Sequence, residues 1–208
     1  LWNLGAKFFV IQVQQIILFQ ATNLLITNLS GPESVTQYNI AYKILNVVVM
    51  VYTIILTPLW PAFTDAYAKK DFKWMKNIYK KMVRVYGVVF IVITLIVITS
   101  PILYKIWIGD KVEIPLLLTI TIAIYTLVHC WDSLQIILIN GVGCVKLQTY
   151  VILIGLILHI PLSLLIGKYI GIYGVIASKT LIAAIYACFF TKQIRKIIKQ
   201  EATGIWIK

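Results

Sequence analysis

The chain has 208 residues, of which 61% are apolar and only 12% are charged. Soluble domains average roughly 45–50% apolar and about 25% charged residues, so this composition argues against an ordinary soluble domain and excludes a disordered chain. The net charge is +12. In a soluble protein this excess would suggest nucleic acid as a partner, whereas in a membrane protein it should sort between the loops on the two sides.

Six apolar stretches are each long enough to span a membrane, which takes about 20 residues in a helix. They cover about 8–29, 42–63, 83–104, 114–140, 148–167 and 172–191. Lipid provides no water for backbone groups, so only helices or closed barrels can span it. Stretches this long and uniformly apolar favour helices over barrel strands. The sequence therefore predicts an all-α fold, a polytopic bundle of six transmembrane helices.

The basic residues fall unevenly on the loops that six spans would leave. Fourteen lie on one side: Lys7, Lys69, Lys70, Lys73, Lys76, Lys80, Lys81, Arg84, Lys146, Lys192, Arg195, Lys196, Lys199 and Lys208. Only Lys43, Lys105, Lys111 and Lys168 lie on the other. Loops rich in lysine and arginine are typically cytoplasmic, which predicts that both termini are cytoplasmic. The asymmetry accounts for the net charge, and we expect no nucleic-acid partner.

Two segments at the predicted cytoplasmic side are amphipathic. In 65–82, Phe72, Met75, Ile78 and Met82 recur at helical spacing with lysines on the other face, which predicts an interfacial basic helix. Residues 192–208 form a similar basic cytoplasmic tail. These segments either only anchor the topology or also attract anionic membrane lipids.

Polar residues inside the spans line up on helix faces, and such residues normally face a bundle interior or a hydrated cavity. These faces predict a lumen lined mainly by the first, second and fourth spans. Its candidates are Gln12, Gln15, Asn23, Lys43, Asn46, Tyr125, His129, Asp132, and Lys179 with Tyr186 beside it. Glutamine and asparagine can instead form hydrogen bonds between helices.

Asp132 is the one acidic residue deep in a predicted span, so it must pair, protonate or face water. It either pairs with Lys179, Lys43 or His129, or it couples transport to protons or cations, with His129 beside it. No metal-ligand spacing surrounds the histidines, and the cysteines Cys130, Cys144 and Cys188 form neither a disulfide framework nor a zinc site. No nucleotide-binding loop or catalytic motif is present. We therefore expect no metal, no cofactor and no enzyme.

Five sequence segments are more informative about the protein family than the overall composition is. They are GPESVTQYNIAYKI (31–44), TPLWPAFTDAYAKKDFKWM (57–75), YKIWIGDKVEIP (104–115), LINGVGCVKLQTY (138–150) and GKYIGIYGVIASKTL (167–181). In this order they resemble the C-terminal half of bacterial polysaccharide (O-antigen and capsule) flippases. These flippases belong to the multidrug/oligosaccharidyl-lipid/polysaccharide exporter superfamily. The chain begins at Leu1, so we also expect it to be a piece of a longer protein, cut at its N-terminus.

The resemblance implies two six-helix lobes around a central cavity, with residues 1–208 as the C-terminal lobe and its own N-terminal lobe as a partner. The implied substrate is an undecaprenyl-diphosphate-linked oligosaccharide, flipped across the inner membrane by alternating access. Basic lumen residues would then meet the diphosphate and amides would bind the sugars. The candidates are Lys43 and Lys179 for the first role and Gln12, Gln15, Asn23 and Asn46 for the second.

Two other functions stay open at this point. A multidrug or cation antiporter lobe of the same superfamily would use Asp132 as its coupling acid, although the basic and amide-rich faces argue against it. A membrane enzyme acting on a lipid-linked sugar would need a compact catalytic group in a loop. The loops are short and lack paired acids, which argues against an enzyme.

Overall fold

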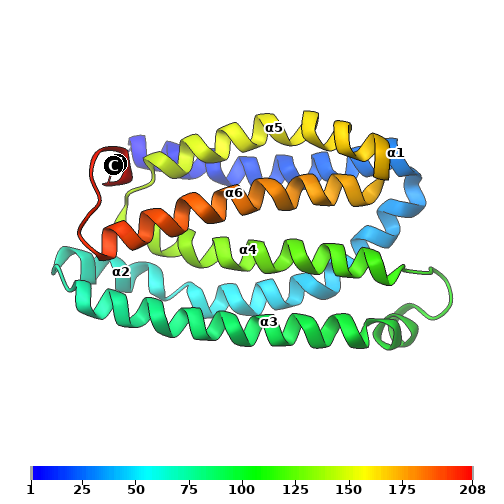
Figure 1. The fold of residues 1–208 in the computed structure, drawn as a ribbon, viewed down its shortest axis with the longest axis horizontal. Helices are drawn as coiled ribbons and strands as arrows, with labels where there is room; N and C mark the ends of the chain where they lie inside the picture. Colours follow the sequence, from blue (N-terminus) through cyan, green and yellow to red (C-terminus); the bar gives the residue numbers. More distant parts are fainter. Residues whose placement is uncertain (1, 208) are drawn as a thin grey trace.

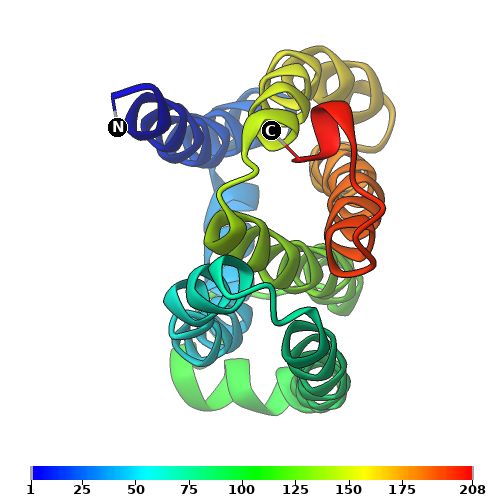
Figure 2. The ribbon, with the colours of Figure 1, turned by 90° about the vertical axis from the view of Figure 1, so that its left-hand side faces the viewer.

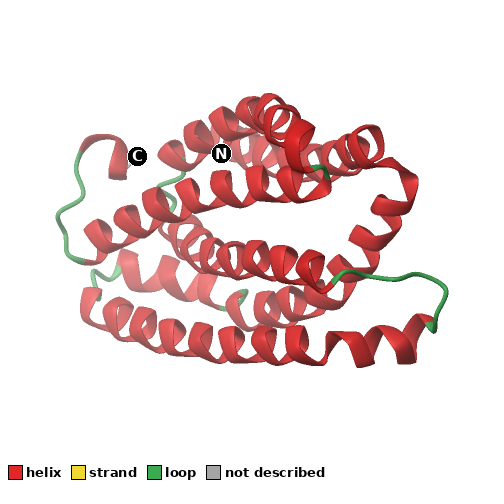
Figure 3. Ribbon diagram, turned by 45° about the vertical axis from the view of Figure 1, so that its right-hand side comes forward, coloured by secondary structure: helices red, strands yellow, loops and turns green. Residues whose placement is uncertain are grey.

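The computed structural model describes the backbone of residues 2–207 and the side chains of residue 9 and residues 20–207. Within this part of the chain the fold is helical, without a strand (Figure 3). The helices are α1 (Trp2–Leu56), α2 (Leu59–Ala68), α3 (Phe72–Ile108), α4 (Leu116–Val142), α5 (Lys146–Ile170) and α6 (Ile172–Ile198), followed by a short 3-10 helix, η1 (Gly204–Ile207). The predicted all-α class is confirmed.

Five of the described helical segments are long and apolar enough to cross a membrane, so the predicted number of six is not matched. Four of them are α3, α4, α5 and α6. Each covers all or nearly all of one predicted span, although most of the helix ends differ from the predicted ones. The fifth, Gln20–Ala68, contains the second predicted span and the last part of the first, residues 20–29. The difference arises because helical structure resumes directly after a single broken residue inside α1.

That residue is Gly31, whose φ of 85° and ψ of 169° lie far from helical values. Glycine reaches such angles because it has no Cβ, and the following Pro32 suits the first position of a new helix. Figure 1 shows the chain reversing direction here, so that α1 consists of a first arm (2–30) and a second arm (32–56). The first arm lies near α5, and the second returns toward α2.

The segment 65–82, predicted as one interfacial helix, is divided between α2 and α3. The break lies at Lys69–Asp71, where Lys70 takes a left-handed φ of 57°. Asp71 then starts α3 by accepting a hydrogen bond from the backbone N–H of Trp74 at 2.9 Å. A capping carboxylate satisfies an N–H that has no partner within the helix. The amphipathic residues after Asp71 are therefore the first turns of α3 rather than a separate helix.

Helix α4 forms the centre of the bundle and contacts α1, α2, α3 and α6. Viewed from one end, α5 and the first arm of α1 lie on one side of α4, and α3 lies at the opposite edge (Figure 2). Large apolar side chains on α3 are exposed, among them Val88, Ile91, Leu95 and Ile98. Such a surface suits contact with lipid tails, as expected for a membrane-spanning helix.

The basic segments gather at one end of the bundle. Figure 1 shows the start of α1, the α2–α3 turn, the α4–α5 connection and the C-terminal tail at this end, and the break in α1 and the α3–α4 connection at the other. Lysine-rich residues 69–84, Lys146 and residues 192–199 lie within or directly beside the elements at the first end.

The C-terminal tail folds back onto this end, and it begins after Ile198 rather than at residue 192, because α6 continues further than predicted. The buried Gln193 amide donates hydrogen bonds from Nε2 to the carbonyls of Cys144 at 2.8 Å and Trp206 at 3.2 Å. The ammonium of Lys196 lies 4.4 Å from the centre of the Trp206 ring. These contacts fasten η1 to the α4–α5 connection and to α6.

Close packing at the start of α6 leads to a stability prediction. A Cβ at Gly174 would lie 2.6 Å from the backbone carbonyl of Ile166 and 2.7 Å from the nitrogen of Gly167, and neither atom can rotate away. We expect Gly174→Ala to lower the free energy of unfolding by about 1–3 kcal/mol, as overpacking usually does. The control Gly87→Ala adds a Cβ in open space. Thermal unfolding in detergent measures both, and equal melting temperatures would contradict this packing.

Candidate functional site

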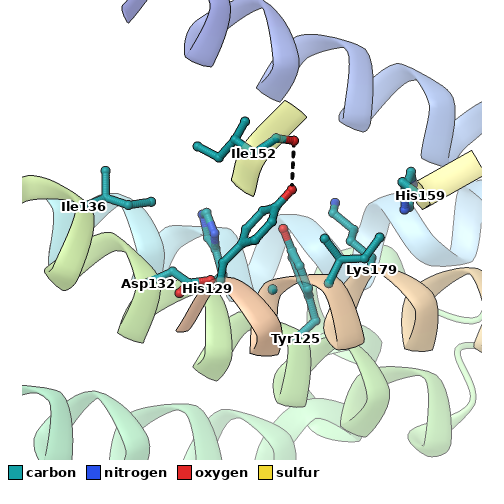
Figure 4. Close-up of a pocket in the computed structure, with 10 residues that line it drawn as sticks. Tyr125, His129, Asp132, Ile136, Ile152, His159 and Lys179 are labelled. Carbon is teal, nitrogen blue, oxygen red and sulfur yellow. Dashed lines mark hydrogen bonds between the residues drawn. The ribbon is translucent and has the colours of Figure 1, made fainter. Parts of the chain in front are cut away.

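A narrow cavity of about 40 Å³ lies between α4, α5 and α6 (Figure 4). Since one water molecule needs at least about 10–15 Å³ of such space, the cavity has room for roughly three. It is lined by Tyr125, His129, Asp132, Ile136, Ile152, His159, Lys179, Ile182, Ala183 and Tyr186. Its polar residues recur at helical spacing, as i, i+4 and i+7 on α4 and as i and i+7 on α6, so each set projects from one helix face.

Lys179 brings a cation into the bundle with little access to solvent, since it is only 8% exposed. Its ammonium lies 4.5 Å from the centre of the Tyr125 ring and 5.7 Å from that of Tyr42. The faces of aromatic rings attract cations, most strongly where water is excluded. The one ion pair recorded among the described residues joins Lys69 to Asp65, so Lys179 has aromatic rather than acidic neighbours.

Asp132 is 3% exposed, and its Oδ1 atom has no hydrogen-bond partner among the described residues. The sequence left open a pairing of Asp132 with Lys179, Lys43 or His129, and none of the three lies within 4 Å of the carboxylate as an ion pair. A buried carboxylate without a partner is costly. A proton, a water molecule or a cation would supply the missing partner, and the adjoining cavity has room for each.

Two histidines complete the cavity in different ways. The ring of His129 stacks on that of Tyr125, with centroids 5.7 Å apart and planes inclined by 8°. His159 is fully buried, with Nε2 3.5 Å from Oγ1 of Thr22 and Nδ1 3.4 Å from Oγ of Ser163. His159 thus links the first arm of α1 to α5, whereas His129 adds a titratable group one turn from Asp132.

The hydroxyl of Tyr186 spans the space between α6 and α5. It donates a hydrogen bond to the carbonyl of Ile152 at 3.2 Å, drawn as a dashed line in Figure 4. It also occupies the space left by Gly155, where a Cβ would overlap the tyrosine ring. This contact holds the α5 wall of the cavity in register with α6.

Three other predicted lumen residues, all on α1, do not line this cavity. Lys43 is exposed and Asn46 is half-buried on the second arm. Asn23, on the first arm, accepts at Oδ1 a hydrogen bond from Nδ2 of Asn39 at 3.4 Å. Gln12 and Gln15 lie outside the residues whose side chains are described. The structure therefore groups Lys179 with Asp132 and His129, and separates this group from Lys43 and Asn46.

A polar stripe runs along the outer face of the second arm and onto the residue directly after it. It consists of side chains three, four or seven residues apart: Thr36, Asn39, Lys43, Asn46, Thr53 and Thr57. All six are exposed or half-buried, and the stripe is flanked by exposed apolar residues such as Val47 and Ile54. The three threonine hydroxyls donate to carbonyls of their own helix, which leaves their oxygens able to accept hydrogen bonds.

Tyr42 is a neighbour of Lys179 that the sequence pattern did not predict. It precedes Lys43, the predicted lumen residue, yet it points in another direction, toward the inside of the bundle. The available signal was the pair Tyr38 and Tyr42, four residues apart and therefore on one helix face, with ring centroids 5.6 Å apart. An aromatic pair on a helix that also carries a polar face indicates a second, inward surface.

The model of one protein family, MatE, matches residues 8–165 of the chain. The match covers α1 to α4 and most of α5, and so includes Lys43, Asp132 and His159, while α6 with Lys179 lies beyond it. No curated protein and no solved structure matches the sequence.

Proposed function

Because the chain belongs to the MatE family, we propose that it is one lobe of a polysaccharide flippase. The family match and the apolar helices make it a multi-pass membrane transporter of the multidrug/oligosaccharidyl-lipid/polysaccharide exporter superfamily. Its substrate would be an undecaprenyl-diphosphate-linked oligosaccharide, moved across the inner membrane by alternating access. The five strings that resemble the C-terminal half of such flippases support this choice, as does the polar stripe on α1.

The polar stripe is the observation that carries the proposal. Polar and charged side chains within a membrane are costly when they face lipid, and they normally face a hydrated path or a partner. Lys43 is exposed at the centre of this stripe, between Asn39 and Asn46. An ammonium suits a diphosphate, and amides and hydroxyls suit sugar hydroxyls. We propose that the stripe faces the N-terminal lobe and forms half of the substrate lumen.

The topology that we propose restores six crossings. The two arms of α1 run in opposite directions (Figure 1), and each would cross the membrane once, joined at Gly31. Together with α3, α4, α5 and α6 they make an even number of crossings, so that both termini share one side. The basic segments gather at the end where both termini lie, and this end would be cytoplasmic by the positive-inside rule.

A second function within the superfamily, a multidrug or cation antiporter lobe, is favoured by Asp132. Its unpartnered Oδ1 and the neighbouring His129 line a cavity large enough for water or a small cation but not for an oligosaccharide. In a flippase the same pair would couple substrate movement to an ion gradient. A drug-accumulation assay in an efflux-deficient host separates the two functions, since only the antiporter would reduce accumulation.

The lumen assignment predicts the effect of one substitution. We expect Lys43→Ala in the full-length protein to reduce surface polysaccharide by about tenfold or more, because a charge-assisted hydrogen bond contributes about 1.5–3 kcal/mol. Lys43→Arg keeps the charge and should retain most export. The measurement is surface polysaccharide in a flippase-deficient strain that carries each variant.

The matched control is Lys105→Ala, which removes an exposed lysine outside the stripe. Normal export by Lys43→Ala, at an expression level equal to that of the parent protein, would refute the role of Lys43 in substrate binding. Loss of export with Lys105→Ala as well would point to a general effect of removing surface charge.

A further inference from the structure

A second cavity, of about 350 Å³, lies at the basic end of the bundle between the α2–α3 turn and the C-terminal tail. Tyr67, Lys70 and Phe72 line it from the turn, and Ile197, Gln200 and Ile207 line it from the end of α6 and the tail. The two walls are more than a hundred residues apart in sequence. Figure 2 shows the turn and the end of α6 at the same end of the bundle.

Lys70 and Gln200 share an unusual backbone conformation. They are the two described residues other than glycine with positive φ, at 57° and 61°. Each follows the C-cap of a helix, where the next backbone N–H bonds back into the last turn: Asp71 to Ala66 at 2.9 Å, and Glu201 to Lys196 at 2.9 Å. Glycine is the usual residue at this position, because a left-handed conformation crowds any Cβ.

The sequence therefore places a lysine and a glutamine at two positions where glycine would fit the backbone better, and both line one cavity. Residues held in strained conformations cluster at functional sites. The left-handed backbone at Lys70 and Gln200 thus brings two polar side chains to one cavity.

The charges around the cavity favour an anion. Lys70 lines it directly, whereas the neighbouring Lys69 is held by Asp65 at 2.7 Å. Two acidic residues are near in sequence: Asp71 accepts the capping hydrogen bond from Trp74, and Glu201 is exposed beside Gln200. Lys70 is thus the basic residue that lines the cavity, and no ion pair joins it to an acidic group among the described residues.

The remaining walls are apolar. The rings of Tyr67 and Phe72 meet edge to face, with centroids 6.1 Å apart, and Ile197 and Ile207 face them across the cavity. The cavity also lies at the end of the bundle where the basic segments gather (Figure 1), and basic residues near a membrane surface attract anionic headgroups. A phospholipid has this combination of a phosphate and an adjoining apolar chain.

We propose that this cavity binds the headgroup of one anionic phospholipid, with the Lys70 ammonium and the Gln200 amide on the phosphate and the Phe72 and Ile207 side chains against the glycerol and upper acyl chain. The site is separate from the transport lumen. It joins the α2–α3 turn to the C-terminal tail through the lipid, at the end of the bundle where anionic lipids attract basic residues.

The test titrates the purified full chain with dioctanoyl-phosphatidylglycerol and follows binding by native mass spectrometry. We expect Lys70→Gly to weaken the dissociation constant at least tenfold and Gln200→Gly about threefold. Glycine relieves the left-handed backbone at both positions, so both variants should melt at the temperature of the parent chain or above it when no lipid is present. A loss of binding therefore cannot be attributed to misfolding.

Three controls decide the identity of the ligand. Lys111→Ala removes an exposed lysine from the α3–α4 connection at the other end of the bundle and should bind as the parent does. Dioctanoyl-phosphatidylcholine should bind at least tenfold more weakly, and inorganic phosphate should not compete at equal concentration. Equal weakening by Lys111→Ala, equal affinity for the zwitterionic lipid, or full competition by phosphate would each overturn the proposal.

Discussion

Replacing Lys179 with methionine is expected to reduce transport by the full-length protein about a hundredfold, while its melting temperature in detergent stays the same or rises. Lys179 is 8% exposed, and the described residues place no carboxylate within 4 Å of it. Exchanging a buried charge for an apolar group of similar volume is often neutral or stabilising. A buried ammonium that the fold does not need is explained if transport needs it, and losing a buried charge contact that forms during transport costs about 2–5 kcal/mol.

The matched control is Lys168→Met, which changes an exposed lysine in the last turn of α5 and should leave both transport and melting unchanged. Surface polysaccharide measures transport, and thermal unfolding measures stability. Full export by Lys179→Met would remove Lys179 from the substrate path. A parallel fall in export and in melting temperature would instead show that the contact with Tyr125 supports the fold.

Replacing Gly31 with alanine is expected to destabilise the protein by about 1–3 kcal/mol and to reduce the yield of monodisperse protein sharply. The cause is the backbone, since a Cβ at this position meets no atom within 4 Å. The combination of φ 85° and ψ 169° is essentially restricted to glycine. With alanine, the two arms of α1 cannot keep their antiparallel arrangement without strain.

Pro32→Ala is the informative comparison, because it changes the other residue at the break. Pro32 lies at the start of the second arm, where its missing N–H is not needed, and a prolyl residue is compatible with the reversal rather than its cause. We therefore expect Pro32→Ala to alter stability by less than about 1 kcal/mol. If Pro32→Ala is as harmful as Gly31→Ala, proline rather than glycine sets the reversal. Size-exclusion chromatography and thermal unfolding in detergent distinguish these results.

Most of the helical architecture follows from long-range patterns that a single sequence contains. Uninterrupted apolar runs locate α3 to α6, because their length matches the thickness of a membrane. The i, i+4 and i+7 spacing of Tyr125, His129 and Asp132 places them on one face of α4, and the structure shows all three lining one cavity. Both inferences depend on helix geometry alone.

The two helix breaks that were predicted wrongly, in α1 and between α2 and α3, have local physical causes. The sequence suggested a connection after the first span, but Pro32 is a good first helical residue, so the helix resumes at once. The helix break at Lys70 was missed because a lysine rather than a glycine takes the left-handed conformation. Asp71 was the available signal, since an aspartate before an apolar periodic segment favours a helix start.

Contacts between segments that are distant in sequence could not be predicted, for a different reason. Nothing in the local pattern around Lys179 specifies that its neighbours are Tyr125 and Tyr42, which lie on two other helices. The same holds for Gln193 and the tail, because an amide inside an apolar helix fits many partners equally well. Such pairings depend on the rotation and register of packed helices, which side-chain packing sets.

The docked tail makes the reactivity of one cysteine thiol depend on the movement of the tail. The thiol of Cys144 is 5% exposed and donates a hydrogen bond from Sγ to the carbonyl of Ile207 at 3.2 Å, and burial raises the pKa of this thiol. Because only the thiolate reacts with an alkylating reagent, reaction at Cys144 is slow while η1 covers it, and it accelerates as the pH rises. The rate of alkylation at Cys144 therefore reports how often the tail detaches from the bundle.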